Sequence, residues 1–190
     1  MGAAERERTV RSSLVERART GDPAAFDALV DLDADRCLAI AFRITRDPGL
    51  AEDAVQQALI QAWRELPRLR EVARYEMWLQ RLLVNACYQE LRSLRRWKDR
   101  VTELPVDAPV AADPYRATDD RDALDRAFAR LSPDRRAIFV LHHHAGLELA
   151  EIAEITGLPV GTVKSRLHYS TDILRAALAA DARVRTEASA

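Results

Sequence analysis

Apolar residues recur at three- and four-residue steps along most of the chain, which is the spacing that predicts amphipathic helices. One such stripe covers residues 26–42, a second runs from Ala54 to Leu66, and a third lies within residues 76–94. Asp47-Pro48-Gly49 separates the first two with residues typical of a turn, and Pro67 ends the second helix. The first half of the chain is therefore predicted to be a bundle of helices.

The pattern disappears after this bundle and returns near Asp122. Residues 99–121 are rich in proline and acidic residues and show no periodicity, so they are interpreted as a flexible acidic linker. Ser132-Pro133 then has the form of an N-cap followed by a first-turn proline. The sequence predicts an all-α fold with two small helical domains, residues 10–98 and 122–180.

Composition narrows the class of protein. The 190 residues are 48% hydrophobic and contain only six glycines, and neither a GxGxxG nor a GxxxxGK[ST] motif occurs, so a glycine-rich phosphate loop is not expected. No apolar run approaches the ~18–20 residues of a membrane span, and the charged N-terminus lacks the apolar segment of a signal peptide. Cys37 and Cys87 fall in apolar stretches and are expected to be buried, reduced thiols. These features predict a cytoplasmic protein without membrane insertion.

Charge is distributed unevenly although the net charge is only −1. Residues 64–100 contain ten basic and five acidic side chains, whereas residues 101–125 contain two basic and seven acidic ones. An excess of arginine favours contact with phosphates, so the basic segment is a candidate for binding a single nucleic acid strand. The alternative is an ordinary solvated surface.

The segment from Gly146 to Tyr169 has the pattern of a helix-turn-helix. A first helix over about 148–155 buries Ile152 and Ile155, and a turn at 156–158 contains a glycine. A second helix begins near Pro159, and such a helix can enter the major groove of DNA. Its predicted outward positions are Val160, Thr162, Lys164, Ser165, Arg166, His168 and Tyr169.

Cationic side chains on this second helix can neutralise phosphates, and polar ones can reach base edges. Lys164 and Arg166 suit the first role, and Thr162, Ser165 and Arg166 suit the second. The alternative is a packing hairpin with a solvated basic face. The turn spacing and the basic second helix favour DNA binding.

GLELAEIAEITGLPVGTVKSRL (146–167) resembles region 4 of the extracytoplasmic-function (ECF) sigma factors of bacterial RNA polymerase. GDPAAFDALV (21–30), AEDAVQQALIQAW (51–63) and WLQRLLVNACYQELRSLRR (78–96) resemble region 2 of the same family, in the same order. The resemblance implies that the partners are core RNA polymerase, through its β′ clamp helices and β flap, and promoter DNA. It also implies an anti-sigma factor, and an acidic linker that passes through the positively charged RNA exit path.

In that family, region 4 reads the −35 element, and region 2 binds both the clamp helices and the non-template strand of the −10 element. By resemblance, the candidate polymerase-binding residues are Glu52, Asp53, Gln56, Gln57 and Gln61. The candidate −10 residues are Arg70, Arg74, Tyr75, Asn85, Arg92, Arg95 and Arg96. Tyr75 or Trp78 is expected to stack on a base, although Trp63 and Trp78 also fit a role in the core.

The sequence departs from the family pattern at several positions. Gln57, Val84 and Gln89 stand where the family usually has Glu, Arg and Asp, and residues 168–172 are less basic than usual. Each lost phosphate contact lowers salt-dependent affinity, so weak DNA binding by the isolated protein is expected.

Two other functions remain open from the sequence. A stand-alone helix-turn-helix regulator would bind duplex operators without polymerase. A metal- or ligand-binding helical enzyme would use His142, His143 and His144. Because consecutive helical residues point 100° apart, the three histidines fit the end of a helix better than a metal site. No catalytic motif occurs, and neither a cofactor nor a metal is expected.

Overall fold

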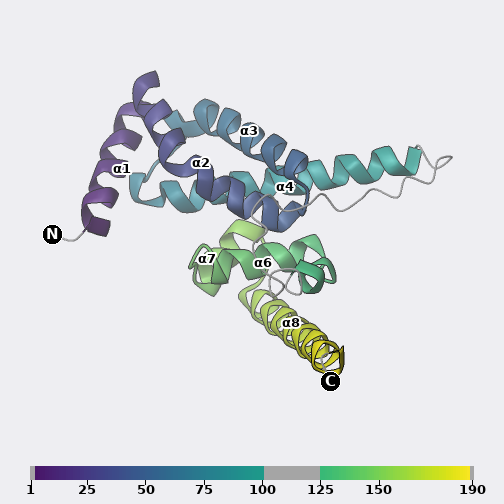
Figure 1. Ribbon diagram of the computed structural model, residues 1–190. Coiled ribbons are helices and arrows are strands. Elements are labelled where there is room, and N and C mark those ends of the chain that lie inside the picture. Colours follow the sequence, from purple (N-terminus) through teal and green to yellow (C-terminus); the bar gives the residue numbers. More distant parts are fainter. Residues whose placement is uncertain (1–2, 101–124, 189–190) are drawn as a thin grey trace.

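The computed structural model describes residues 3–100 and 125–188, and within these ranges it contains helices and no strand (Figure 1). This confirms the all-α prediction. The first half comprises α1 (Ala3–Arg19), α2 (Pro23–Thr45), α3 (Pro48–Glu65), the 3-10 turns η1 (Leu66–Arg68) and η2 (Val72–Arg74), and α4 (Tyr75–Arg100). The second half comprises α6 (Pro133–His143), α7 (Leu149–Thr156) and α8 (Val160–Ala188).

Short polar caps separate the first three helices. The Asp22 carboxylate accepts a hydrogen bond from the Ala25 amide at 3.2 Å, and Pro23 begins α2 with the φ that a helix requires. The Asp47 carboxylate likewise accepts from the Leu50 amide at 2.9 Å at the start of α3. The break at Asp47 confirms the predicted turn.

Two helices are longer than their sequence patterns indicate. The third predicted helix, over residues 76–94, is α4 and continues to Arg100. Helix α8, which is the second helix of the helix-turn-helix, runs on to Ala188, past the predicted end near residue 180. Both project beyond the packed body of the molecule (Figure 1). The sequence has few apolar residues at positions 95–100 and 181–188, so no apolar pattern marked where these helices end.

The two halves share one hydrophobic core, although the sequence predicted two domains joined by a tether. Helix α2 packs against α6, and α4 packs against α7. Ile40, Ile44 and Leu83 from the first half belong to the same buried cluster as Ile138 and Val163 from the second. The predicted linker lies outside the described residues beyond Arg100, so the structure leaves its flexibility a prediction.

Both cysteines lie inside the first half. Cys37 is 5% exposed and Cys87 is fully buried, as predicted. Burial disfavours the thiolate and raises the pKa of each thiol to about 12, so neither is reactive near neutral pH. Among the described residues, none of the helices has an apolar stretch that could cross a bilayer.

Candidate nucleic-acid interface

The helix-turn-helix predicted from the sequence is formed by α7 and α8. At the start of α7, the Glu151 carboxylate accepts a hydrogen bond from the Glu148 amide at 2.8 Å. Gly157 ends the helix in the left-handed conformation, with φ of 69°, which is costly for any side chain larger than glycine. Ile152 and Val163 are fully buried between the two helices, so α8 is held at a fixed angle.

The predicted −35 residues lie on the first three turns of α8. Lys164, Ser165 and His168 are exposed, as are Val160 and Tyr169, while Thr162 and Arg166 are half-buried. Val163 and Ser170 on the same helix are buried, and the Ser170 hydroxyl donates to the Arg166 carbonyl at 2.7 Å. The sequence therefore separated the inner and outer faces of this helix correctly. Whether the outer face binds DNA stays a prediction.

Two side chains from the first turn of α6 contact the outer face of α8, and the sequence analysis missed both. The Asp134 carboxylate lies 3.6 Å from the Arg166 guanidinium. The Arg135 guanidinium lies 4.2 Å from the centre of the Tyr169 ring, which is a cation–π contact. Because α6 is distant in sequence, no local spacing could have indicated these contacts. They restrict the rotamers of two predicted DNA-contacting residues.

A stripe of exposed polar side chains follows α4. Asn85, Arg92 and Arg96, which were predicted for the −10 element, lie on one helical face. Arg81 and Gln89 complete the stripe at steps of three or four residues, and both are exposed. Arg81 was not among the predicted residues, although its spacing of four before Asn85 was a usable signal. Arg95 is also exposed, on the adjacent face.

The loop that precedes α4 is held from α1. The Arg19 guanidinium donates to the Leu69 carbonyl at 3.1 Å. Arg70 is exposed beside this bond, as its predicted role requires. Arg74 is also exposed, but its guanidinium is bonded to the Glu154 carboxylate of α7. One predicted −10 residue is therefore paired with the helix-turn-helix.

The prediction that Tyr75 stacks on a base is wrong for this structure, because the side chain is only 2% exposed. Tyr75 lies at the start of α4, near the buried carboxylate of Asp33. Burial raises the Asp33 pKa although Arg11 lies beside it, and burial also raises the pKa of Tyr75. The polar context of Tyr75 in the sequence concealed its place in the core.

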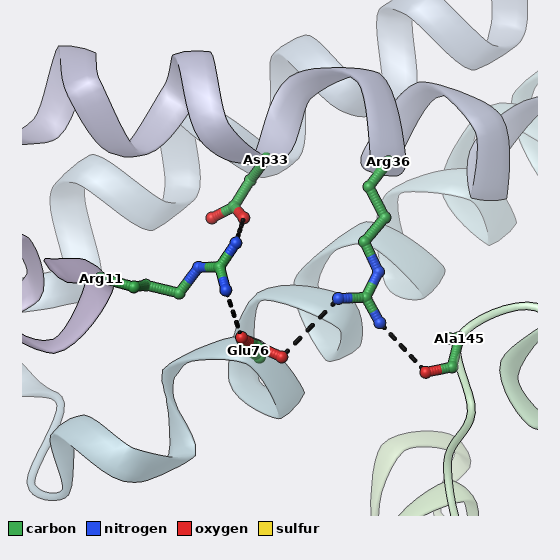
Figure 2. A network of polar contacts seen from close by, with 5 residues as sticks. All are labelled: Arg11, Asp33, Arg36, Glu76 and Ala145. Carbon is green, nitrogen blue, oxygen red and sulfur yellow. Dashed lines mark hydrogen bonds and ion pairs between the residues drawn. The ribbon is translucent and has the colours of Figure 1, made fainter. Parts of the chain in front are cut away.

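Asp33 belongs to a charged network that joins three helices of the first half to the second half (Figure 2). The Arg11 guanidinium bridges the Asp33 carboxylate at 3.1 Å and the Glu76 carboxylate at 2.7 Å. The Arg36 guanidinium lies 3.7 Å from the other Glu76 oxygen and donates to the Ala145 carbonyl at 3.0 Å. Figure 2 shows Arg36 reaching from α2 to the turn that follows α6.

The predicted polymerase-binding residues share the outer side of α3. All of them are exposed: Glu52, Asp53, Gln56, Gln57 and Gln61. Ile60 and Trp63 continue this surface and are 45% and 41% exposed. Trp63, which also fitted a role in the core, instead lies at the surface. The centroid of its ring is 5.0 Å from that of the Phe26 ring. Exposed apolar side chains among polar ones are typical of protein interfaces.

The three consecutive histidines lie at the end of α6. A ring nitrogen of His142 lies 2.9 Å from the Leu147 carbonyl, and the His143 ring packs at a tilt against the Phe139 ring, with the centroids 4.3 Å apart. His144 lies at the boundary with α2, where burial and the nearby Arg43 and Arg36 lower its pKa. These contacts fit the helix-end interpretation of the sequence.

Comparison with known proteins agrees with this arrangement. Residues 29–97 match the family described as sigma-70 region 2, and residues 121–169 match the family described as sigma-70, region 4. The ECF RNA polymerase sigma factor SigL of Mycobacterium tuberculosis is 34% identical over 172 residues, which cover 86% of this chain and 94% of SigL. The RNA polymerase sigma-H factor of Pseudomonas aeruginosa is 30% identical, with 87% and 92% covered.

A solved structure shows the same arrangement of helices. The sigma factor RpoE of Bartonella quintana, crystallised in complex with the anti-sigma factor NepR, has 25% identity and a TM-score of 0.67. The match covers 82% of this chain and 98% of RpoE. CnrH, solved in complex with the cytosolic domain of CnrY, has the same fold at 23% identity and a TM-score of 0.64.

Proposed function

Since the chain belongs to the ECF subfamily of sigma-70 RNA polymerase sigma factors, we propose that its three exposed polar faces divide promoter recognition between them. The chain is a factor that directs core RNA polymerase to promoters. The observation that carries the proposed division is that the predicted residues lie on three separate elements, α3, α4 with its preceding loop, and α8. Each face can then meet a different partner at the same time.

Region 4 is proposed to read the −35 element through α8 and to contact the β flap. Lys164 is exposed and carries a full positive charge on the helix that would enter the groove. Ser165 and Arg166 follow it toward the base edges. Counterions released from the phosphates supply much of the binding free energy, so the affinity will fall with salt.

Region 2 is proposed to hold the −10 non-template strand along the α4 stripe. Asn85 supplies an amide that can donate to and accept from a base, and Arg92 and Arg96 supply charge for the backbone. Arg70 and Arg74 extend the cationic surface at the loop. Since Tyr75 is buried, the half-exposed Trp78, which lies 6.1 Å from the Tyr75 ring, is the aromatic candidate for stacking.

The outer side of α3 is proposed to contact the β′ clamp helices, with Ile60 and Trp63 adding apolar area to the polar set. Replacing Ile60 by Glu should weaken core polymerase binding by about tenfold, because apolar anchors dominate interface energy. Leu32→Glu is a matched control, since Leu32 is a similarly exposed apolar residue on α2. Equal effects of both variants on binding measured by fluorescence anisotropy would place the interface elsewhere.

We propose that the protein itself performs no covalent chemistry and that the polymerase forms the phosphodiester bonds. It would act in the cytoplasm, where its polymerase is found. An anti-sigma factor is a proposed partner, because the RpoE relative was crystallised with one.

Run-off transcription tests this function directly. The purified chain and core polymerase, offered a library of randomised promoters, should initiate at a defined −10 and −35 pair. If transcripts appear only when another sigma factor is added, the chain is instead a stand-alone regulator, an alternative that the match to both sigma regions does not favour.

A further inference from the structure

The start of α6 lies against the face of α8 that the proposed function assigns to the −35 element. Asp134, in the first turn of α6, places its carboxylate 3.6 Å from the Arg166 guanidinium. One residue further on, the Arg135 guanidinium lies over the Tyr169 ring, 4.2 Å from its centre. Two neighbouring residues of α6 therefore contact two residues of the proposed −35 set that are about one helical turn apart on α8.

Apolar packing within the second half fixes this approach. Leu131, which lies just before α6, and Leu174 of α8 are 3% and 4% exposed and belong to one buried cluster. The Phe128 and Phe139 rings pack against the same cluster, edge to face, with their centroids 5.3 Å apart. Close-packed side chains of this kind leave two elements little freedom to shift against each other. The first turn of α6 is consequently held against α8 by the fold of the second half.

The ion pair between Asp134 and Arg166 adds little to stability. The two side chains are 57% and 33% exposed, and solvent screens the attraction between charges so exposed. Their separation of 3.6 Å is also longer than a hydrogen bond between these groups. The main consequence of the pair is positional, because the carboxylate restricts a guanidinium that otherwise has many rotamers.

An arginine on a recognition helix has two ways to contact DNA. It can bind a backbone phosphate, which carries no sequence information, or it can donate both arms of its fork to the O6 and N7 atoms of a guanine. A carboxylate beside the guanidinium disfavours the first contact, because it repels a phosphate in the same place. The second contact stays open, since O6 and N7 are acceptors without a net charge. A guanidinium that is already oriented also loses less rotamer entropy on binding.

We infer that Asp134 positions Arg166 for a guanine in the −35 element and keeps it off the phosphate backbone. Asp134 thus sets specificity through another side chain, and Arg166 makes the contact. The inference rests on the proposed function, because it assumes that the outer face of α8 reads the −35 element. It goes beyond that function by naming the base that one side chain reads and the residue of another helix that determines the choice.

Selection of −35 sequences by the holoenzyme tests the assignment. The full chain, bound to core polymerase, is offered duplexes with a randomised −35 element, and the bound duplexes are sequenced. Arg166→Ala should abolish a guanine preference at one position, which identifies the base that Arg166 reads. Asp134→Asn should lower the preference at that same position by about three- to tenfold, which is part of the discrimination that a bidentate contact provides.

Affinity for DNA without a −35 element gives a readout that a merely structural role of Asp134 would not produce. Asp134→Asn removes a negative charge and frees the guanidinium, so this affinity should rise about two- to fivefold, together with its dependence on salt. Loss of a structural contact would lower the affinity instead. Asp31→Asn is the matched control, because it removes the same charge from an exposed position on α2. The control should change the affinity by less than about twofold and keep the base preference.

A double variant shows whether Asp134 acts through Arg166. In a chain that already carries Arg166→Ala, Asp134→Asn should have no further effect on base preference. The carboxylate could instead read a base itself, since an aspartate can accept from cytosine N4. A cytosine preference that Asp134→Asn removes and Arg166→Ala keeps would therefore overturn the inference. A guanine preference that Asp134→Asn leaves unchanged would overturn it as well.

Failure of the inference and failure of the proposed function are distinguishable. If the wild-type holoenzyme selects a −35 sequence and Arg166→Ala keeps every base preference, the inference is wrong and the proposed function stands. If the wild-type holoenzyme initiates but selects no −35 sequence, the proposed role of α8 is contradicted, and the inference with it.

Discussion

Regions 2 and 4 present their proposed DNA surfaces in different states. On α8, Lys164 and Ser165 are exposed and face away from the core. In region 2, by contrast, Arg74 is bonded to Glu154 and Tyr75 is buried against Asp33. The difference teaches that the position of the recognition helix follows from local pattern, whereas the exposure of the proposed −10 residues depends on distant segments of the chain.

The largest expected effect concerns the exposed surface of α8. Arg166→Ala should weaken binding of the polymerase holoenzyme to a −35 duplex by about 1–3 kcal/mol and lower the slope of affinity against salt. Arg175→Ala is the control, because Arg175 is 77% exposed on the same helix two to three turns further on. An unchanged salt slope for Arg166→Ala would remove the phosphate or base contact from the proposal.

In region 2, a double variant tests the α4 stripe. Asn85→Ala with Arg92→Ala should reduce promoter opening by about tenfold or more, since each lost hydrogen-bonding partner costs about 1–3 kcal/mol. Core polymerase binding should not change. Arg64→Ala, an exposed arginine on α3 outside the proposed sets, serves as the control. Loss of core binding by the double variant would assign the stripe to the protein interface or to the fold.

Arg74 belongs to the proposed −10 surface and is bonded to Glu154 of the helix-turn-helix, so its replacement affects two contacts. Arg74→Ala removes a proposed strand contact and also breaks the bond to Glu154. Combined with Asn85→Ala, it should therefore impair initiation while core binding is kept. Reduced core binding by this pair, measured by the anisotropy assay, would contradict both roles of Arg74.

The burial of Tyr75 has a smaller and separable consequence. Tyr75→Phe removes a buried polar hydroxyl near the Asp33 carboxylate and should change the free energy of unfolding by about 1–2 kcal/mol. Initiation by the folded variant should be unchanged. A tyrosine stacked on DNA from the surface would show no loss of stability on urea unfolding, so an unchanged urea midpoint would restore the interpretation made from the sequence.

The smallest effect concerns pH at the boundary between the halves. Burial together with Arg43 and Arg36 lowers the pKa of His144, so the folded state binds its proton less readily than the unfolded state. Stability is then complete above the ordinary histidine pKa and declines as pH falls through it. His144→Gln should flatten the fall of melting temperature between pH ~7.5 and ~5.5. A fall of equal size in wild type and variant would assign the acid sensitivity to other groups.

The sequence predicted local features well. The turns at Asp47 and Gly157, the buried Ile152 and Val163, and the outer face of α8 all depend on residues within a few positions of one another. Such features follow from helical periodicity and turn chemistry. The resemblance to sigma regions 2 and 4 rested on the same local motifs.

Features that join distant segments could not be predicted in this way. The buried place of Tyr75 depends on Asp33, the rotamer of Arg166 depends on Asp134, and the state of Arg74 depends on Glu154. None of these pairs has a local spacing that a single sequence reveals. The exposed position of Trp63 was missed for the same reason, since the size and apolarity of a side chain do not tell which side of α3 is covered.

The central claim is that exposed faces on α3, on α4 with its preceding loop, and on α8 contact the polymerase, the −10 strand and the −35 element separately. Run-off transcription with the purified chain, core polymerase and a library of randomised promoters tests it most directly. The account predicts initiation at a defined −10 and −35 pair. Initiation only after another sigma factor is added would contradict it.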